Sequence, residues 1–213
     1  VDFKGTNMKV SRLALGCMRI GDKSVEEVEE LVKTALDLGI NFFDHADIYA
    51  GGKSEKVFGE VLKKHPDWRK KMYIQSKCGI VPGVCYDFSQ EHILKCVDES
   101  LKNLNTDYLD VLLLHRPDVL MDPKELALTF DILHTSGKVK YFGVSNMNPM
   151  QIELIKKYSN QPIIVNQVQF NLVNAGIMDC GINVNMTNNE AINRDGSLLE
   201  YCYLHSSSDL CDL

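Results

Sequence analysis

The chain has 213 residues, of which 45% are hydrophobic and 24% charged, which is ordinary for a soluble globular domain. This composition excludes collagen-like, low-complexity and wholly disordered chains. The formal net charge of −6 lacks the basic surplus of a general nucleic-acid binder, although a small basic pocket for a phosphate stays open. We expect one domain over residues 1–213.

Cysteine usage and the absence of targeting patterns point to one compartment. The chain has seven cysteines, an odd number, and no CxxC pair, so we expect neither a disulfide framework nor a zinc site. Reduced thiols favour the cytoplasm. No signal peptide and no apolar run long enough to cross a bilayer is found, so no membrane association is expected.

Taken in chain order, the hydrophobic period alternates between that of a strand and that of a helix. The first predicted helix begins at Ser24, where Glu27 completes a capping box, and Gly39 ends it. Five further helices are predicted, at 54–64, 89–104, from Asp122-Pro123 to Gly137, from Asn148-Pro149, and from Ser197. The predicted strands lie at 12–16, 40–43, 72–76, 111–114, 140–144 and 163–168.

These strands are apolar on both faces and are separated by amphipathic helices, which indicates parallel βαβ units. No GxGxxG follows the first strand, so a Rossmann dinucleotide site has no support. The alternative is a (β/α)8 barrel, in which functional residues gather at the carboxyl ends of the strands. Polar groups do recur there, at Asp44, Lys77, His115, Ser145-Asn146 and Gln167. The fold class is therefore α/β of the (β/α)8 barrel type, incomplete, with about six βα units.

Four residues have side chains that suit the protonation of an alkoxide. A tyrosine is a weak acid, with an unperturbed pKa of about 10, and a nearby ammonium makes proton donation easier. Lys77 could supply that charge to Tyr49, and Asp44 could hold Lys77 in place. His115 could orient a substrate oxygen. Taken singly, each also fits a cap, a packing residue or a solvated side chain, so spacing alone does not decide.

Four motifs carry a resemblance that decides the matter. They are Phe43-Asp44 through Tyr49 with Ser54-Glu55 and Gly59, then Ile74-Gln75-Ser76-Lys77, then Asp107-Tyr108-Leu109-Asp110 leading to Leu114-His115-Arg116, and Gly137 through Asn146. From about Arg12 to Gly196 the sequence resembles the aldo-keto reductase superfamily. The resemblance implies a (β/α)8 barrel that reduces aldehydes and ketones, small-molecule carbonyl substrates, with NADPH or NADH.

The resemblance also implies roles for individual positions. Tyr49 would be the proton donor, with Asp44 and Lys77 tuning it and His115 orienting the carbonyl. Six residues would bind the cofactor: Gly16, Cys17, Asp44, Ser145, Asn146 and Gln167. Of these, Gly16 and Cys17 would lie beside the nicotinamide ribose, and Ser145, Asn146 and Gln167 would bind the carboxamide. Met18 and His45 would edge the substrate pocket, although packing under the barrel rim is as good a reading of Met18.

The sequence departs from the family after Gln167. We expect the family's seventh and eighth strands, and its loop over the pyrophosphate, to be missing, and residues 203–213 to form an atypical tail. The chain could be a fragment, a truncated product or one part of an assembly that pairs through open sheet edges. Cofactor binding is then expected to be weak in a monomer. The alternative function is a non-catalytic reductase-like binding or regulatory module.

Overall fold

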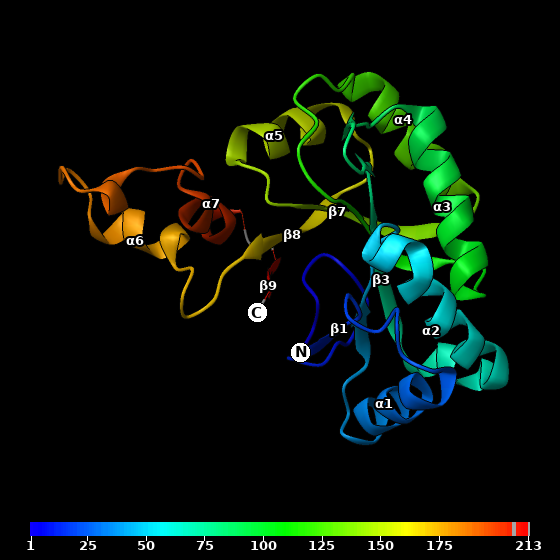
Figure 1. The fold of residues 1–213 in the computed structure, drawn as a ribbon. Coiled ribbons are helices and arrows are strands. Elements are labelled where there is room, and N and C mark those ends of the chain that lie inside the picture. The colour runs from blue at the N-terminus through cyan, green and yellow to red at the C-terminus, as the bar shows by residue number, and fades with distance from the viewer. Residues whose placement is uncertain (206–207, 213) are drawn as a thin grey trace.

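The computed structural model describes residues 1–205 and 208–212. Its centre is a parallel sheet of seven strands, and the predicted βα alternation is confirmed (Figure 1). In spatial order, the strands are β1 (Ala14–Gly16), β2 (Phe42–Asp44), β3 (Tyr73–Cys78), β6 (Leu109–Leu114), β7 (Val139–Ser145), β8 (Ile163–Gln169) and β9 (Ser208–Asp212). The order does not return to β1, so the described sheet is an open part of a barrel.

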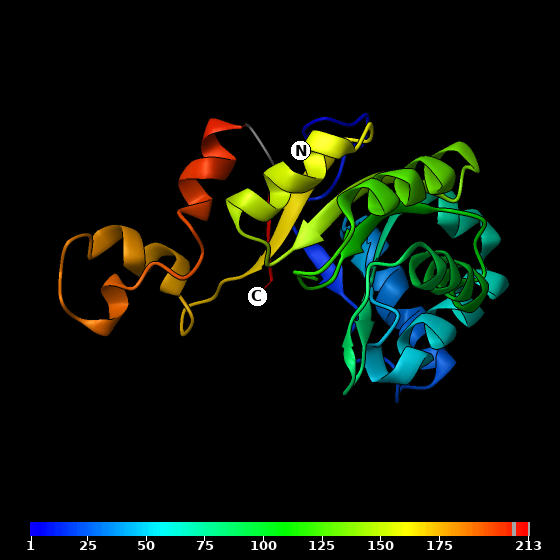
Figure 2. The same cartoon turned by 90° about the horizontal axis from the view of Figure 1, so that it is seen from above.

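Helices follow the strands in sequence and cover the outer face of the sheet (Figures 1 and 2). They are α1 (Val25–Asp37), α2 (Lys53–Lys64), α3 (Gln90–Leu104), α4 (Pro123–Thr135) and α5 (Pro149–Tyr158), with the 3-10 helices η1 (Tyr49–Gly52) and η2 (Pro66–Lys71). In the described part of the chain, no helix has the length and apolar character needed to span a membrane.

The predicted helix starts are confirmed in their chemistry. The Ser24 hydroxyl accepts from the Glu27 amide, and the Glu27 carboxylate accepts from the Ser24 amide, which completes the capping box. Asp122 and Asn148 cap α4 and α5, each with a proline as the first helical residue. Each cap satisfies backbone N–H groups that have no partner within the helix.

Gly59, one of the residues of the first motif, has a packing role. It lies on α2 where this helix crosses α3, and a Cβ built there would lie 1.9 Å from the carbonyl oxygen of Asn103. No real side chain tolerates that separation, so only glycine lets the two helices approach this closely. Gly59 therefore sets the distance between the second and third βα units.

The strands are buried on both faces, and each face has its own core. The outer core packs Phe43, Phe142 and other strand residues against the helices. The inner core is smaller and gathers Phe42, Val111, Leu113 and Val165 around residues from the chain start. Side chains alternate along a strand. On β2, Asp44 therefore lies on the same inner face as Phe42. On β3, Gln75 and Lys77 lie on the same inner face as Tyr73.

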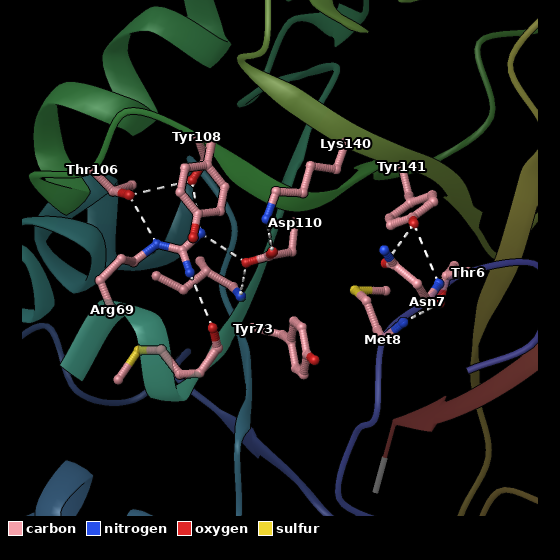
Figure 3. Close-up of polar contacts among 12 residues, drawn as sticks. Thr6, Asn7, Met8, Arg69, Tyr73, Thr106, Tyr108, Asp110, Lys140 and Tyr141 are labelled. Carbon is pink, nitrogen blue, oxygen red and sulfur yellow. Dashed lines mark hydrogen bonds and ion pairs between the residues drawn. The ribbon is translucent and has the colours of Figure 1, made fainter. Parts of the chain in front are cut away.

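The N-terminal end of the sheet is closed by the first ten residues and an ion network. Phe3 stacks on Phe42 with ring centroids 5.8 Å apart, and the Tyr141 hydroxyl donates to Asn7 Oδ1 at 2.9 Å. Figure 3 shows the adjacent network, in which the Arg69 guanidinium and the Lys140 ammonium both reach the Asp110 carboxylate, at 2.7 and 2.9 Å.

The chain after β8 differs from the prediction. We expected no seventh strand, but Ser208–Asp212 forms β9 and pairs in parallel with β8, from Val165–Ser208 to Gln169–Asp212. The physical reason is that the open edge of β8 presents unpaired backbone groups, which a neighbouring extended segment satisfies. The expected helix from Ser197 is confirmed as α7 (Leu198–Leu204).

Besides η1 and η2, four further elements had not been predicted. They are a short antiparallel hairpin of β4 (Ile80–Val81) and β5 (Cys85–Tyr86), the helix α6 (Gly176–Ile182), and the 3-10 helix η3 (Asn189–Ala191). Figure 2 shows α6 and α7, orange to red, apart from the row formed by α1 to α4. The hydroxyl of Tyr201 in α7 donates to Glu153 in α5, which joins this part to the sheet.

Candidate active site

The residues predicted at the strand ends come together at the carboxyl edge of the sheet. Asp44 is the last residue of β2, Lys77 lies near the end of β3, and His115 directly follows β6. Tyr49 begins η1, five residues after Asp44. Because parallel strands end on the same edge, three separate βα units deliver these side chains to one place.

Lys77 is the centre of this cluster. Its buried ammonium donates to both oxygens of Asp44, at 2.6 and 2.7 Å, and to the Tyr49 hydroxyl oxygen at 2.9 Å. A fourth contact joins it to the backbone oxygen of His45 at 3.0 Å. The ring of Tyr49 lies edge-on to the His115 ring, with centroids 5.9 Å apart. The structure thus brings Asp44, Tyr49, Lys77 and His115 together.

The charges in the cluster follow from burial and contact. Burial alone would lower the pKa of Lys77, but the Asp44 carboxylate and the Tyr49 hydroxyl outweigh it and hold the pKa above its usual range. Burial and the Lys77 ammonium lower the pKa of His115 to about 4. At neutral pH the site therefore holds the Lys77 ammonium beside the Tyr49 hydroxyl group, together with an uncharged His115 imidazole.

A pair of glutamines extends the cluster across the sheet. The Gln75 side-chain nitrogen donates to Asp44 Oδ1 at 2.6 Å and to Gln167 Oε1 at 3.0 Å. The Gln167 side-chain nitrogen donates to Asp44 Oδ2 at 3.2 Å. Gln167 was predicted as a nicotinamide contact, and it lies beside the catalytic candidates. All three side chains are buried.

Gln75 was not predicted to have a role, although it lies within the second motif. The signal was present, because Gln75 stands two residues before Lys77 in a predicted strand and so shares its face. Its position opposite Asp44 in the register of β2 and β3 could not be read from the sequence.

The remaining predicted cofactor residues lie at the ends of β7 and β8. Ser145 ends β7, and Asn146 follows it with a positive φ of 52° while donating from its side chain to Ser145 Oγ at 3.1 Å. The backbone N–H of Asn146 donates to the backbone oxygen of Gln167 at 2.9 Å. A cavity of about 450 Å³ opens here, lined by Asn146, Gln169, Arg194 and others, but not by Tyr49, Lys77 or His115.

The predicted site residues at the end of β1 differ in their exposure to solvent. Gly16 ends β1, in register with Asp44, and the Cys17 amide donates to the Asp44 backbone oxygen at 2.8 Å. Cys17 itself is buried, and burial raises the pKa of its thiol. Met18 is 51% exposed, which fits a place at the rim of a pocket.

His45 does not lie where we expected it. Its side chain is fully buried, its ring centroid lies 4.5 Å from that of Phe58, and neither ring nitrogen has a hydrogen-bond partner in the part of the chain that the structure describes. Burial lowers its pKa to about 3, so the ring is uncharged. A side chain without solvent access cannot edge a substrate pocket, and the alternation along the chain turns it toward α2 instead of the inner face.

Comparison with known proteins agrees with this geometry. The model of the Aldo/keto reductase family matches residues 12–184. The oxidoreductase YdhF of Escherichia coli is 42% identical over 177 residues, which is 79% of this chain and 59% of YdhF. The 6-dehydroglucose reductase of Agrobacterium fabrum is 37% identical over 178 residues, which is 78% of this chain and 60% of that enzyme.

Among solved structures, the thermostable aldo-keto reductase Tm1743, in complex with the inhibitor epalrestat, matches with a TM-score of 0.78 and 27% identity. The match covers 98% of this chain and 70% of Tm1743. The fold is that of an open part of the α/β barrel of these proteins. The chain belongs to the aldo/keto reductase family, and it spans about three fifths of the length of the curated relatives that it matches.

Proposed function

We propose that the protein reduces aldehydes or ketones to alcohols with a nicotinamide cofactor, NADPH or NADH. The observation that carries this proposal is the contact of a buried ammonium with a phenol, Lys77 with Tyr49 at 2.9 Å, at the carboxyl edge of the sheet. A bound nicotinamide cofactor would supply the hydride. This chain's own residues would supply the proton and hold the carbonyl.

The proton would move from Tyr49 Oη to the oxygen of the substrate as that oxygen gains charge. The bond broken is the phenolic O–H and the bond formed is the O–H of the alcohol, which leaves a phenolate on Tyr49. Lys77 stabilises that phenolate through charge and hydrogen bonding. Asp44 balances the ammonium and fixes its position with two short contacts.

His115 would orient the carbonyl. Its lowered pKa, about 4, leaves the imidazole uncharged at neutral pH, with one N–H to donate. Its Nδ1 is buried and has no hydrogen-bond partner within the described structure. The His115 ring is only partly buried, and its centroid lies 5.9 Å from that of Tyr49, which fits a substrate oxygen that both side chains contact.

The residues present fit the carboxamide of a nicotinamide. That group offers an acceptor and two donors, and the contacts of Gln167 leave one N–H and one oxygen lone pair unspent. Ser145 and Asn146 stand beside it on the neighbouring strand end. The carboxamide contacts are thus part of the proposal, as are Gly16, Cys17 and Met18 at the end of β1.

The test is turnover of a reactive aldehyde, with NADPH and with NADH, by the parent protein and by Tyr49→Phe. Loss of a positioned proton donor is expected to lower kcat by about 10²–10⁴-fold. Cofactor binding, followed by fluorescence titration, should stay within about threefold, since the variant keeps the ring. Equal turnover in both proteins would refute the role of Tyr49.

The open order of the sheet supports the second candidate, a non-catalytic module. Within the described residues, β1 and β9 each have one hydrogen-bonded neighbour, so each offers a free edge for another chain. This candidate predicts no saturable cofactor binding and a solution mass above that of one chain. Saturable binding by a monomer favours the reductase.

A further inference from the structure

Gln75 is one of three side chains, with Asp44 and Gln167, that form a closed ring of hydrogen bonds. Its side-chain nitrogen contacts Asp44 Oδ1 at 2.6 Å and Gln167 Oε1 at 3.0 Å. Gln167 completes the ring with its own nitrogen, 3.2 Å from Asp44 Oδ2. Three strands, β2, β3 and β8, therefore meet through three buried side chains.

The number of donors decides how these amides are oriented. A glutamine side chain has two N–H donors and one oxygen that accepts. Gln75 uses both donors on its two neighbours, and its own buried oxygen has no hydrogen-bond partner among the described residues. The two neighbouring acceptors, Asp44 Oδ1 and Gln167 Oε1, select this orientation, since the reverse one would point the Gln75 oxygen at both of them.

Gln75 in turn fixes the amide of Gln167. Rotating the Gln167 amide by half a turn would place its nitrogen against the Gln75 nitrogen, donor against donor. The same rotation would place its oxygen against the Asp44 carboxylate, acceptor against acceptor. Both contacts would become repulsive in a buried site, where an unmet polar group is expensive. With Gln75 removed, only the Asp44 contact still chooses the orientation.

We propose that Gln75 is a positioning residue, which holds Gln167 in the one orientation that leaves an N–H for the carboxamide oxygen of the nicotinamide. Gln75 acts through Gln167 and has no role in the proton transfer itself. We call the fixing of the Gln167 amide by its hydrogen bond from Gln75 the lock. The lock is argued from the contacts in this chain, whereas the carboxamide contact rests on the proposed function.

The lock is tested without cofactor. Gln75→Met keeps the length of the side chain and removes both donors. In protein labelled with ¹⁵N at glutamine side chains, we expect the Gln167 N–H protons to exchange with water about tenfold faster in this variant, the effect of losing one buried hydrogen bond. Gln167→Met assigns the resonances.

Asn166→Leu is the matched control. Asn166 is a buried amide next to Gln167 on β8, but its contacts, 2.9 and 3.4 Å, go to the backbone of Met147. Asn166→Leu also removes a buried amide, yet the exchange rate of the Gln167 side-chain N–H protons should stay within about twofold of the parent value. Unchanged exchange in Gln75→Met, or equal acceleration in both variants, would overturn the lock.

The carboxamide contact is tested by a double-mutant cycle of NADPH affinity. Gln75→Met and Gln167→Met should each weaken binding about five- to tenfold, and the double variant should be no weaker than Gln167→Met alone. Multiplying losses would show that Gln75 acts independently and would overturn the positioning role. If the parent protein binds no NADPH, the proposed function and the carboxamide contact fail together, while the exchange measurement still decides the lock.

Discussion

The two ends of the sheet each hold a buried carboxylate with cationic partners, yet they differ in what is left over. At the N-terminal end, Asp110 accepts from Arg69, Lys140 and the Ile74 amide. Arg69 donates three further N–H groups, to Thr106 Oγ1 and to the backbone oxygens of Met72 and Tyr108. Its guanidinium carbon also lies 3.9 Å from the centroid of the Tyr108 ring (Figure 3).

At the carboxyl end, Asp44 is equally well satisfied, but the groups around it are not. The Lys77 ammonium donates to the Tyr49 hydroxyl, and the His115 Nδ1 has no partner among the described residues. Gln167 has a partner at each polar atom, which leaves it one N–H and one oxygen lone pair. A buried ion pair is therefore no sign of a functional site by itself. Unspent donors and acceptors beside it are the distinguishing feature.

The largest expected effect separates the two ends directly. Lys77→Met removes the ammonium that stabilises the phenolate, and we expect kcat for a reactive aldehyde to fall by about 10²–10⁴-fold. Because this change leaves Asp44 uncompensated, the double variant Asp44→Asn, Lys77→Met serves as the better-folded comparison. Turnover close to the parent value in either folded variant would contradict the role of Lys77.

Arg69→Met is the counterpart at the N-terminal end. Removing the guanidinium leaves the buried Asp110 short of its strongest partner, and we expect the free energy of unfolding to fall by about 3–5 kcal/mol. Turnover per folded molecule should stay within about twofold, because no atom of this network faces the carboxyl edge. Urea unfolding and turnover on the same samples measure both quantities. A large loss of turnover without loss of stability would break the comparison.

The sequence predicted more of one end than of the other. Asp44, Lys77 and His115 could be found because the barrel rule places functional residues at strand ends. The burial of His45 and the ring through Gln75 could not, since they depend on which faces meet and on register. The Arg69 network could not be found either, because Arg69 stands in a basic run, Trp68-Arg69-Lys70-Lys71, that is typical of a solvated loop. In the structure, Arg69 packs inward.

The third effect concerns Asp47, a half-buried acid outside both networks. Burial, with a smaller contribution from the Glu55 carboxylate, raises the pKa of Asp47 to about 7, although a hydrogen bond from Cys96 opposes this. The native state thus holds a proton that the unfolded state releases near pH 4, so the free energy of unfolding falls as pH rises between these values.

Asp47→Asn should remove that fall. We expect the variant to gain on the order of 1–2 kcal/mol over the parent between pH 5 and pH 8, measured as the change in the difference between their unfolding free energies. Equal pH dependence in the two proteins would show that Asp47 is ionised in the native state. Glu60→Gln, at an exposed site on α2, is the control for a change of charge alone.

The smallest expected effect tests whether the N-terminal network depends on burial or on charge count. Lys140 contacts Asp110 at 2.9 Å, as Arg69 does at 2.7 Å, but its side chain is 47% exposed against 10% for Arg69. Water already solvates the Lys140 ammonium, so Lys140→Met should cost less than about 1 kcal/mol in urea unfolding. The loss should shrink further in high salt, which screens exposed pairs. A loss equal to that of Arg69→Met would mean that Asp110 needs two cations, and that the network is held by its total charge instead of by the buried guanidinium.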